Sequence, residues 1–184
     1  IHLTDILPMM DRVPIYIDLA ALCQEQLGDP GRAIDSLEQA RRISAENLGV
    51  LQPLANLYYQ QGQMPQAAEL FESIVSLTAD NDQLRDCHFL LGEIYRDHLN
   101  LPPKAVEHFN KTLDVDHSFF KAFESIEQIL VGHKQWGLLE ENYRLMIQRT
   151  PRNLVEARVA LWRNLGELYR RVLKNLDGAI MAYE

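Results

Sequence analysis

One short phrase occurs twice in this chain, 74 residues apart. LGEIYR at residues 91–96 returns as LGELYR at residues 165–170, and each copy is followed at matching distances by an alanine and then an aromatic residue. A catalytic motif seldom needs to occur twice in one short chain, whereas a stacking unit must. The chain is therefore expected to be a repeat array, with its function along a surface rather than in a single pocket.

A shorter period of 34 residues separates Gly28 from Gly62. Apolar residues at helical spacing precede and follow each glycine, which predicts two helices joined by a tight turn. Gly28 can adopt the left-handed conformation that ends a helix, Asp29 can cap the next helix, and Pro30 suits its first position. By the same chemistry, further second helices are expected to open at Pro102 and at Asp177.

These residues resemble a known family. Trp162, Leu165, Gly166 and Tyr169 reproduce W-x2-L-G-x2-Y, the first half of the tetratricopeptide repeat signature, and Tyr143 with Pro151 fits its second half in another unit. The resemblance extends to long tetratricopeptide arrays of bacterial proteins. It implies an all-α fold, a right-handed α-solenoid of about five helix–turn–helix units.

The units are expected at residues 14–47, 48–81, 85–119, 120–153 and 159–184, the last one truncated, and residues 1–13 as the end of a preceding repeat or a cap. Units three and five carry one extra residue in the turn and follow insertions at 82–84 and 154–158. Both insertions consist of good helix formers. We therefore expect the first helix of these units to start a turn early, near Asn81 or Asp82 and near Asn153, so that standard and long units alternate.

Small residues are expected where helices approach closely. On the first helix of each unit these are Ala21, Ala55, Gly92 and Gly166; on the second they are Ala33, Ala67, Ala105 and Ala179. Large residues fill the space between successive pairs: Leu37, Phe71, Phe109 and Tyr143. Unit four has Glu127 in place of the small residue and Leu139 in place of the alanine, so looser or shifted packing is expected there.

Composition excludes several classes of function. The net charge is −8, from 18 basic and 26 acidic residues, which argues against nucleic-acid binding. No apolar run is long enough to insert in a membrane. Cys23 and Cys87 form no disulfide framework and suit a reducing, cytoplasmic compartment. The chain lacks a signal peptide, starts without Met and ends inside an expected helix, so we interpret it as a fragment.

No catalytic or cofactor constellation is evident. The six histidines are scattered without the paired spacing of metal ligands, and they are interpreted as surface or packing residues. There is no nucleophile elbow and no glycine-rich phosphate loop. The chain is therefore expected to bind no metal or cofactor and to be no enzyme.

The resemblance implies a partner-binding groove lined by one face of each first helix. By the family register this face includes Asn56, Tyr59, Phe89, Glu93, Arg96, Lys121, Gln128, Arg163, Asn164, Glu167, Arg170 and Arg171. Tyr59 and Phe89 are candidate apolar anchors. The arginines of the last unit are candidate partners for an acidic segment, although they can equally pair with Glu167 on a solvated surface. Only Asn56 and Lys121 stand near the places that clamp a C-terminal carboxylate in some arrays of the family, which argues against such a clamp.

Three functions remain open. The first is a non-catalytic scaffold that binds a peptide or partner protein along this face. The second is a structural module that self-associates end to end. The third is a recognition arm within a larger enzyme. A repeat array without a catalytic constellation favours the first.

Overall fold

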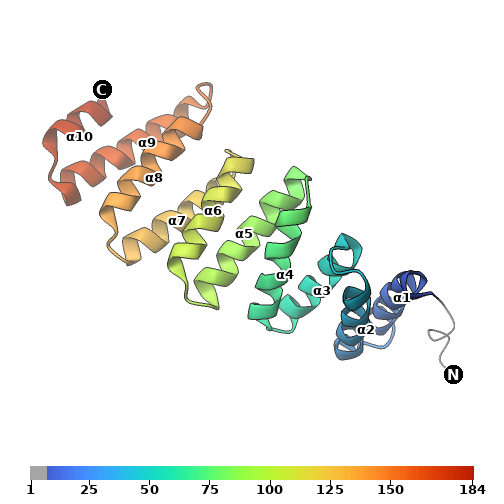
Figure 1. Cartoon of the computed structure of the whole chain (residues 1–184). Helices are drawn as coiled ribbons and strands as arrows, with labels where there is room; N and C mark the ends of the chain where they lie inside the picture. The colour runs from blue at the N-terminus through green and yellow to red at the C-terminus, as the bar shows by residue number, and fades with distance from the viewer. Residues whose placement is uncertain (1–7) are drawn as a thin grey trace. The chain divides into compact units, whose positions relative to one another are not determined.

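The computed structural model describes residues 8–184, and every regular element in this range is a helix (Figure 1). The α-helices are α1 (Arg12–Glu25), α2 (Pro30–Ile43), α3 (Leu48–Gln60), α4 (Met64–Leu77), α5 (Asn81–Asp97), α6 (Pro102–Val115), α7 (Phe120–Gly132), α8 (Trp136–Arg149), α9 (Val155–Glu167) and α10 (Leu176–Tyr183). A 3-10 turn, η2 (Met9–Asp11), precedes α1, and a π-helix, η3 (Leu168–Leu173), follows α9. The expected all-α fold of stacked helix pairs is confirmed.

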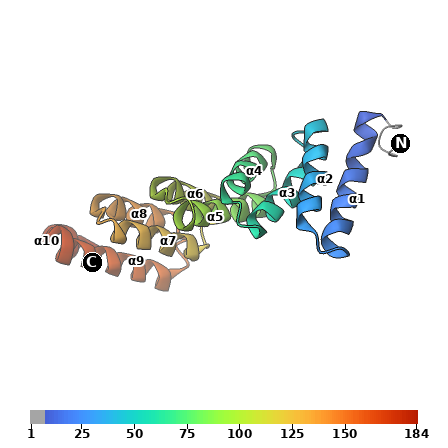
Figure 2. The same ribbon diagram turned by 90° about the horizontal axis from the view of Figure 1, so that it is seen from below.

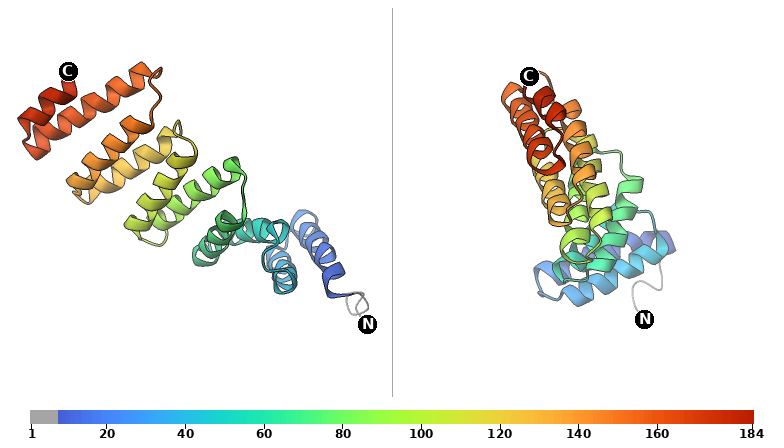
Figure 3. Two further views of the ribbon diagram at one scale, coloured as in Figure 1. Left: turned by 45° about the horizontal axis from the view of Figure 1, so that its top comes forward. Right: turned by 90° about the vertical axis from the view of Figure 1, so that its left-hand side faces the viewer.

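The chain divides into two compact parts, Ile1–Cys87 and His88–Glu184, and the division falls inside α5. In the first part α1 packs on α2, α2 on α3, and α3 on α4; Figure 2 shows α1 and α2 side by side. Leu37, Leu54 and Phe71 are fully buried between these helices. In the second part, α7 packs on α6 and α8, and α9 packs on α8 and α10 (Figure 3). We number the pairs α1–α2 to α9–α10 as repeats one to five.

Local chemistry sets the starts of the second helices. Asp29 accepts a hydrogen bond from the amide of Arg32, and Pro30 is the first residue of α2, as expected. Prolines also occupy the first turns of α4 and α6. The start expected for the last helix, Asp177, is one residue too late. α10 begins at Leu176, because Asn175 is its cap and accepts a hydrogen bond from the amide of Gly178.

The early start of two first helices is also largely confirmed. α5 begins at Asn81, where the carboxylate of Asp80 accepts a hydrogen bond from the amide of Gln83 at 2.9 Å. α9 begins at Val155, earlier than the standard unit start at residue 159 but two residues after the expected Asn153. The sequence 150–154 that follows α8 forms a turn instead, closed by a bond from the amide of Leu154 to the carbonyl of Pro151.

The turns between paired helices fall into two kinds. In repeats two and four, the amide after the left-handed residue bonds to the carbonyl five residues back, from Gln63 to Tyr58 and from Gln135 to Leu130. In repeats one, three and five it bonds six residues back, from Asp29 to Cys23, from Leu101 to Tyr95 and from Asn175 to Tyr169. The extra residue is taken up as a wide turn at the end of the first helix, which in repeat five forms the π-helix η3.

Repeat one therefore belongs with the long repeats, which corrects the register expected for it. Ala20 is 3% exposed and occupies the close-packed position, whereas Ala21 is exposed. The alignment of Gly28 with Gly62 concealed this offset, because the extra residue lies before the glycine. The alternation of long and standard repeats consequently begins at the first repeat.

The close approaches at the other small residues are confirmed. A Cβ atom built on Gly92 would lie 2.5 Å from the ring of Phe109, and one on Gly166 would lie 2.8 Å from the ring of Tyr183. Of the two alternatives expected for repeat four, looser packing is wrong, because Leu139 and Tyr143 are both buried. The hydroxyl of Tyr143 donates a hydrogen bond to the carboxylate of Glu127. A polar contact there replaces the contact between a glycine and an aromatic ring.

Candidate partner-binding surface

The expected groove residues lie on the first helices of repeats two to five. Asn56 and Tyr59 are on α3 in the first compact part, Asn56 exposed and Tyr59 half-buried. The other ten lie in the second part: Phe89, Glu93 and Arg96 on α5, Lys121 and Gln128 on α7, Arg163, Asn164 and Glu167 on α9, and Arg170 and Arg171 on η3. Asn56 and Gln128 are exposed, and within residues 8–184 no hydrogen bond or ion pair joins either of them to another expected site residue.

Charged and aromatic side chains of α5 and α7 meet in one group. The ammonium of Lys121 lies 3.6 Å from a carboxylate oxygen of Glu93 and 4.5 Å from the centre of the Phe89 ring. The side chain of Lys121 is nevertheless 66% exposed. Because exposed ion pairs contribute little free energy, this lysine can exchange its carboxylate for one on a partner at small cost.

Arg96 joins the same two helices. Its guanidinium donates to both carboxylate oxygens of Asp97, at 2.7 and 2.8 Å, and to the hydroxyl of Ser125 on α7 at 3.1 Å. The bonds from Arg96 hold the pKa of Asp97 below its usual value, so the pair stays charged. Together with Phe89, Glu93 and Lys121, these residues form what we call the α5–α7 cluster.

Phe89 contributes packing more than contact area. Only 9% of its surface is exposed, because the rings of Phe119 and Phe109 lie with their centres 5.0 and 5.4 Å from its own. The ring is the apolar floor beneath Lys121 rather than an open anchor. The expected role of Phe89 as an exposed apolar contact is therefore reduced to supporting the cation above it.

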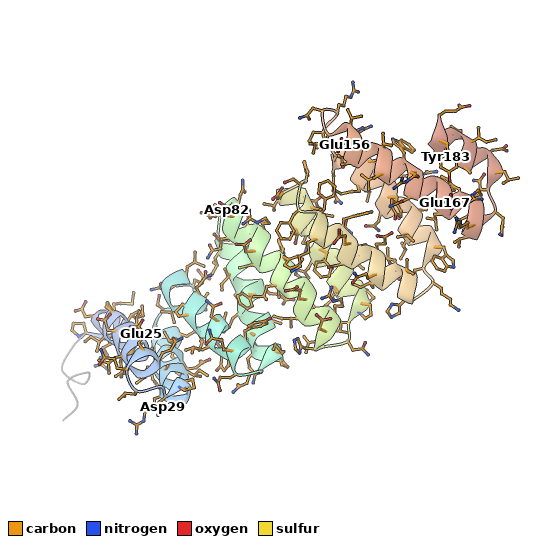
Figure 4. The ribbon with its side chains drawn as sticks, turned by 180° about the vertical axis from the view of Figure 1, so that it is seen from behind. Glu25, Asp29, Asp82, Glu156, Glu167 and Tyr183 are labelled. Carbon is orange, nitrogen blue, oxygen red and sulfur yellow. The ribbon has the colours of Figure 1, made fainter. Side chains whose placement is uncertain are left out.

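The second group lies on α9 and η3. Glu167 receives two hydrogen bonds from Arg170, at 3.0 and 2.9 Å, and also pairs with Arg171. Tyr183 on α10 donates its hydroxyl to the same carboxylate at 2.9 Å, and Figure 4 shows the two side chains together. Hydrogen bonds from Arg170 and then Tyr183 lower the pKa of Glu167. For Arg170 and Arg171, the alternative of pairing with Glu167 is thus what the structure shows.

Two residues of this group are differently placed. Asn164 is exposed. Arg163 is exposed, and within residues 8–184 it has no carboxylate at ion-pair distance. Sequence reasoning missed Tyr183 as a member of the group, although it had aligned this residue with Phe109. The signal was the tyrosine in place of phenylalanine, since a tyrosine hydroxyl can donate to a nearby carboxylate.

Four titratable residues outside this surface are buried and serve packing. His88 and His108 are buried with their Nδ1 atoms 3.1 Å apart. Cys23 and Cys87 are buried free thiols, and burial, followed by the charge of Asp86, raises the pKa of Cys87 to about 11. Within the described range, no three His, Cys, Asp or Glu side chains gather where they could hold a metal ion. From residue 8 onward, no helix combines the length and apolar character that a membrane span requires.

Comparison with known proteins agrees with this fold. Residues 25–86 match the family model described as tetratricopeptide repeat. No curated protein matches the sequence significantly. Three solved structures are similar. MamA is 16% identical with a TM-score of 0.59, over 94% of this chain and 88% of its own. YrrB, described as a tetratricopeptide repeat protein with an unusual peptide-binding site, is 16% identical with a TM-score of 0.56, over 94% and 83%. PilF of Pseudomonas aeruginosa is 18% identical with a TM-score of 0.54, over 92% and 72%.

At such identities the solved structures show the fold, which is typical of protein–protein interaction modules. The family model covers α2, α3, α4 and the start of α5, and paired helices joined by similar turns continue along the rest of the described chain. Residues 25–86 therefore match the tetratricopeptide repeat family, and the chain has the fold of solved structures such as YrrB.

Proposed function

We propose that this chain is a non-catalytic scaffold that binds a peptide or a segment of a partner protein on the α5–α7 cluster. The observation that carries the proposal is the exposed ammonium of Lys121, held over an aromatic floor and beside a weakly bound carboxylate. A partner carboxylate can take the place of Glu93, while Arg96 stays in position through Asp97 and Ser125. The cluster thus offers one exchangeable cation and one fixed cation side by side.

The remaining expected groove residues stay candidates for partner contacts. Arg163 is a candidate for an acidic residue of the partner because it is exposed and has no ion pair within residues 8–184. In the first compact part, Asn56 and Tyr59 on α3 offer an amide and a half-buried ring as a separate candidate contact. We also propose a reducing compartment such as the cytoplasm, which suits the two free thiols Cys23 and Cys87.

The test begins with peptides selected from a random library on the immobilised chain, whose affinities are measured by calorimetry. Lys121→Glu should weaken binding at least tenfold, because it removes the exchangeable cation and adds a repelling charge. Lys111→Glu is the matched control: this lysine, on α6, is also exposed and paired with a carboxylate, that of Glu107. Equal affinities for wild type and Lys121→Glu would rule out the α5–α7 cluster as the binding site.

A specific observation also favours self-association as a second candidate. Leu176 and Ile180 on α10 are 66% and 56% exposed, and Tyr183 on the same helix is also exposed. Contiguous exposed apolar side chains often mark interfaces. Light scattering over a range of concentrations should then show a rising mass for wild type and a constant one for Ile180→Lys. A wild type that stays monomeric throughout excludes this candidate.

A further inference from the structure

A cavity of about 880 Å³ opens in the second compact part, outside the α5–α7 cluster. It lies between the end of α8, the start of α9 and the last helix α10. The residues on which the argument rests are Arg144, Arg149, Arg152, Arg158, Trp162 and Met181. Its volume falls within the range of about 300–1,000 Å³ typical of ligand sites, which is room for a few side chains of a partner.

The cavity shares no residue with the surface expected from the family register. On α9 it is lined by Arg158 and Trp162, which are four residues apart on one stripe of the helix. Asn164 and Glu167 lie on a stripe roughly half a turn away, since an α-helix has about 3.6 residues per turn. The cavity is therefore a second site on the opposite face of α9.

Its lining carries four arginines and one carboxylate, Asp177, in a chain whose net charge is −8. Two of the arginines are neutralised from outside the lining: Arg144 pairs with Glu140 at 2.8 Å, and Arg149 pairs with Asp114 at 2.5 Å.

The charges of the other two, Arg152 and Arg158, are not balanced by an ion pair within the described residues. Arg158 donates to the carbonyls of Ile147 and Thr150, at 2.8 and 3.0 Å, which fixes its position, and it has no ion pair among the described residues. Arg152 is exposed, and within residues 8–184 no carboxylate lies at ion-pair distance from it. The rim of the cavity therefore presents uncompensated positive charge next to a guanidinium that is already oriented.

Apolar surface lies beside these cations. Trp162 on α9 is 38% exposed and Met181 on α10 is 76% exposed, and both line the cavity. Large apolar side chains next to arginines are the composition found at the centres of protein interfaces. Methionine adapts its shape to different apolar partners, which suits a site for a peptide side chain.

We propose that this cavity binds an acidic segment of a partner protein, with a carboxylate on Arg152 and Arg158 and a neighbouring apolar side chain against Trp162 and Met181. Guanidinium groups bind carboxylates in a bidentate manner, which gives the segment a fixed register. The strongly acidic chain repels long polyanions, so the complementary partner is a short acidic and apolar peptide rather than a nucleic acid.

The experiment uses the full chain with Trp136→Phe, so that Trp162 is the single tryptophan and its fluorescence reports on the cavity. The probe is a heptapeptide, Glu-Leu-Asp-Phe-Glu-Leu-Asp. We expect saturable changes in Trp162 fluorescence, at least tenfold weaker binding with Arg152→Gln, and a comparable loss when the acids of the peptide become Gln and Asn. Because Arg152 is exposed, its substitution leaves the fold intact.

Arg163→Gln is the matched control, since it removes an exposed arginine from the other face of α9. Loss of binding with Arg163→Gln but not with Arg152→Gln would place the peptide on the groove and overturn the proposal. Equal binding of the neutral peptide, or tighter binding of a single-stranded oligonucleotide, would also overturn it.

Discussion

At the scale of single residues, the fold depends on what fits between paired helices. Gly92 faces the ring of Phe109 and Gly166 faces that of Tyr183, each so closely that a methyl group would overlap the ring. Packing this tight has no free volume into which the rings can move. A single methyl group at either position would therefore prevent the paired helices from packing this closely, and both copies of the doubled phrase have a glycine there.

Gly92→Leu should lower the free energy of unfolding by about 1–3 kcal/mol, because the added side chain overpacks the contact with Phe109. Gly137→Leu on α8 is the matched control, since a Cβ atom there meets nothing within 4 Å and its stability should hardly change. Urea denaturation followed by circular dichroism measures both. Equal stabilities of the two variants would show that the register assigned to repeat three is wrong.

The buried pair His88–His108 should make stability depend on pH. The two Nδ1 atoms lie 3.1 Å apart, so one must accept a hydrogen bond from the other. If both rings were charged, both Nδ1 atoms would be donors and the hydrogen bond would be lost. Burial, followed by the charge of Lys111, lowers the pKa of His88 below 6.5, so in the window just under 6.5 the unfolded chain binds more protons at this residue. This contribution is complete above about pH 6.5 and is lost as the pH falls through the lowered pKa.

His88→Phe should therefore flatten the slope of stability against pH between about pH 5 and pH 7, measured by urea denaturation at each pH. His98→Gln serves as the control, since it removes an exposed histidine from the turn that directly follows the same helix. A slope that His88→Phe leaves unchanged would assign the pH dependence to other groups.

At the scale of elements, the turn sets how each pair of helices meets. Five residues end their first helix in the left-handed conformation: two are glycines, Gly28 and Gly62, and three carry side chains, Asn100, Lys134 and Lys174. Backbone carbonyls five or six residues back hold the following amide in all five turns. The wide turn is thus a property of the odd repeats and does not depend on glycine.

Lys134→Gly should stabilise the chain by up to about 1 kcal/mol. A residue with a Cβ atom adopts the left-handed conformation at a cost of about 1–2 kcal/mol, and glycine removes part of this cost. The reciprocal change, Gly62→Ala in the equivalent turn of repeat two, should destabilise it. Thermal denaturation tests both. A lower melting temperature for Lys134→Gly would mean that the lysine side chain has a stabilising contact in solution.

At the scale of the whole molecule, stability is carried by contacts between neighbouring helices. Each compact part has its own buried residues, such as Leu54 in the first and Ile94 in the second. A perturbation in one repeat should therefore act mainly on its neighbours and weaken with distance along the chain.

Hydrogen exchange of Gly92→Leu tests this locality. Protection should fall most for amides of α5 and α6 and least for those of α1 and α2, because the altered contact with Phe109 lies within repeat three. Mass spectrometry of proteolytic fragments resolves the helices separately. A uniform loss of protection across all helices would instead show that the chain unfolds as one cooperative unit.

The sequence by itself determined the elements and their pairing. Helical periodicity, the cap at Asp29 and the prolines that follow the turns are local signals, and short-range sterics act on them directly. The sequence likewise predicts close helix contacts at Gly92 and Gly166, because only a small residue fits at such positions. The groove register stays a prediction, and the residues that it names lie on α3, α5, α7, α9 and η3.

The tertiary structure alone decided which side chains remain available. Phe89 is buried by two rings, one of which, Phe119, comes from the segment before α7. Arg170 and Arg171 are engaged with Glu167, whereas Arg152 and Arg158 stand beside a cavity that three separate helices enclose. These outcomes depend on distances between residues remote in sequence. A one-dimensional pattern specifies the face on which a side chain lies, and only packing specifies what it meets there.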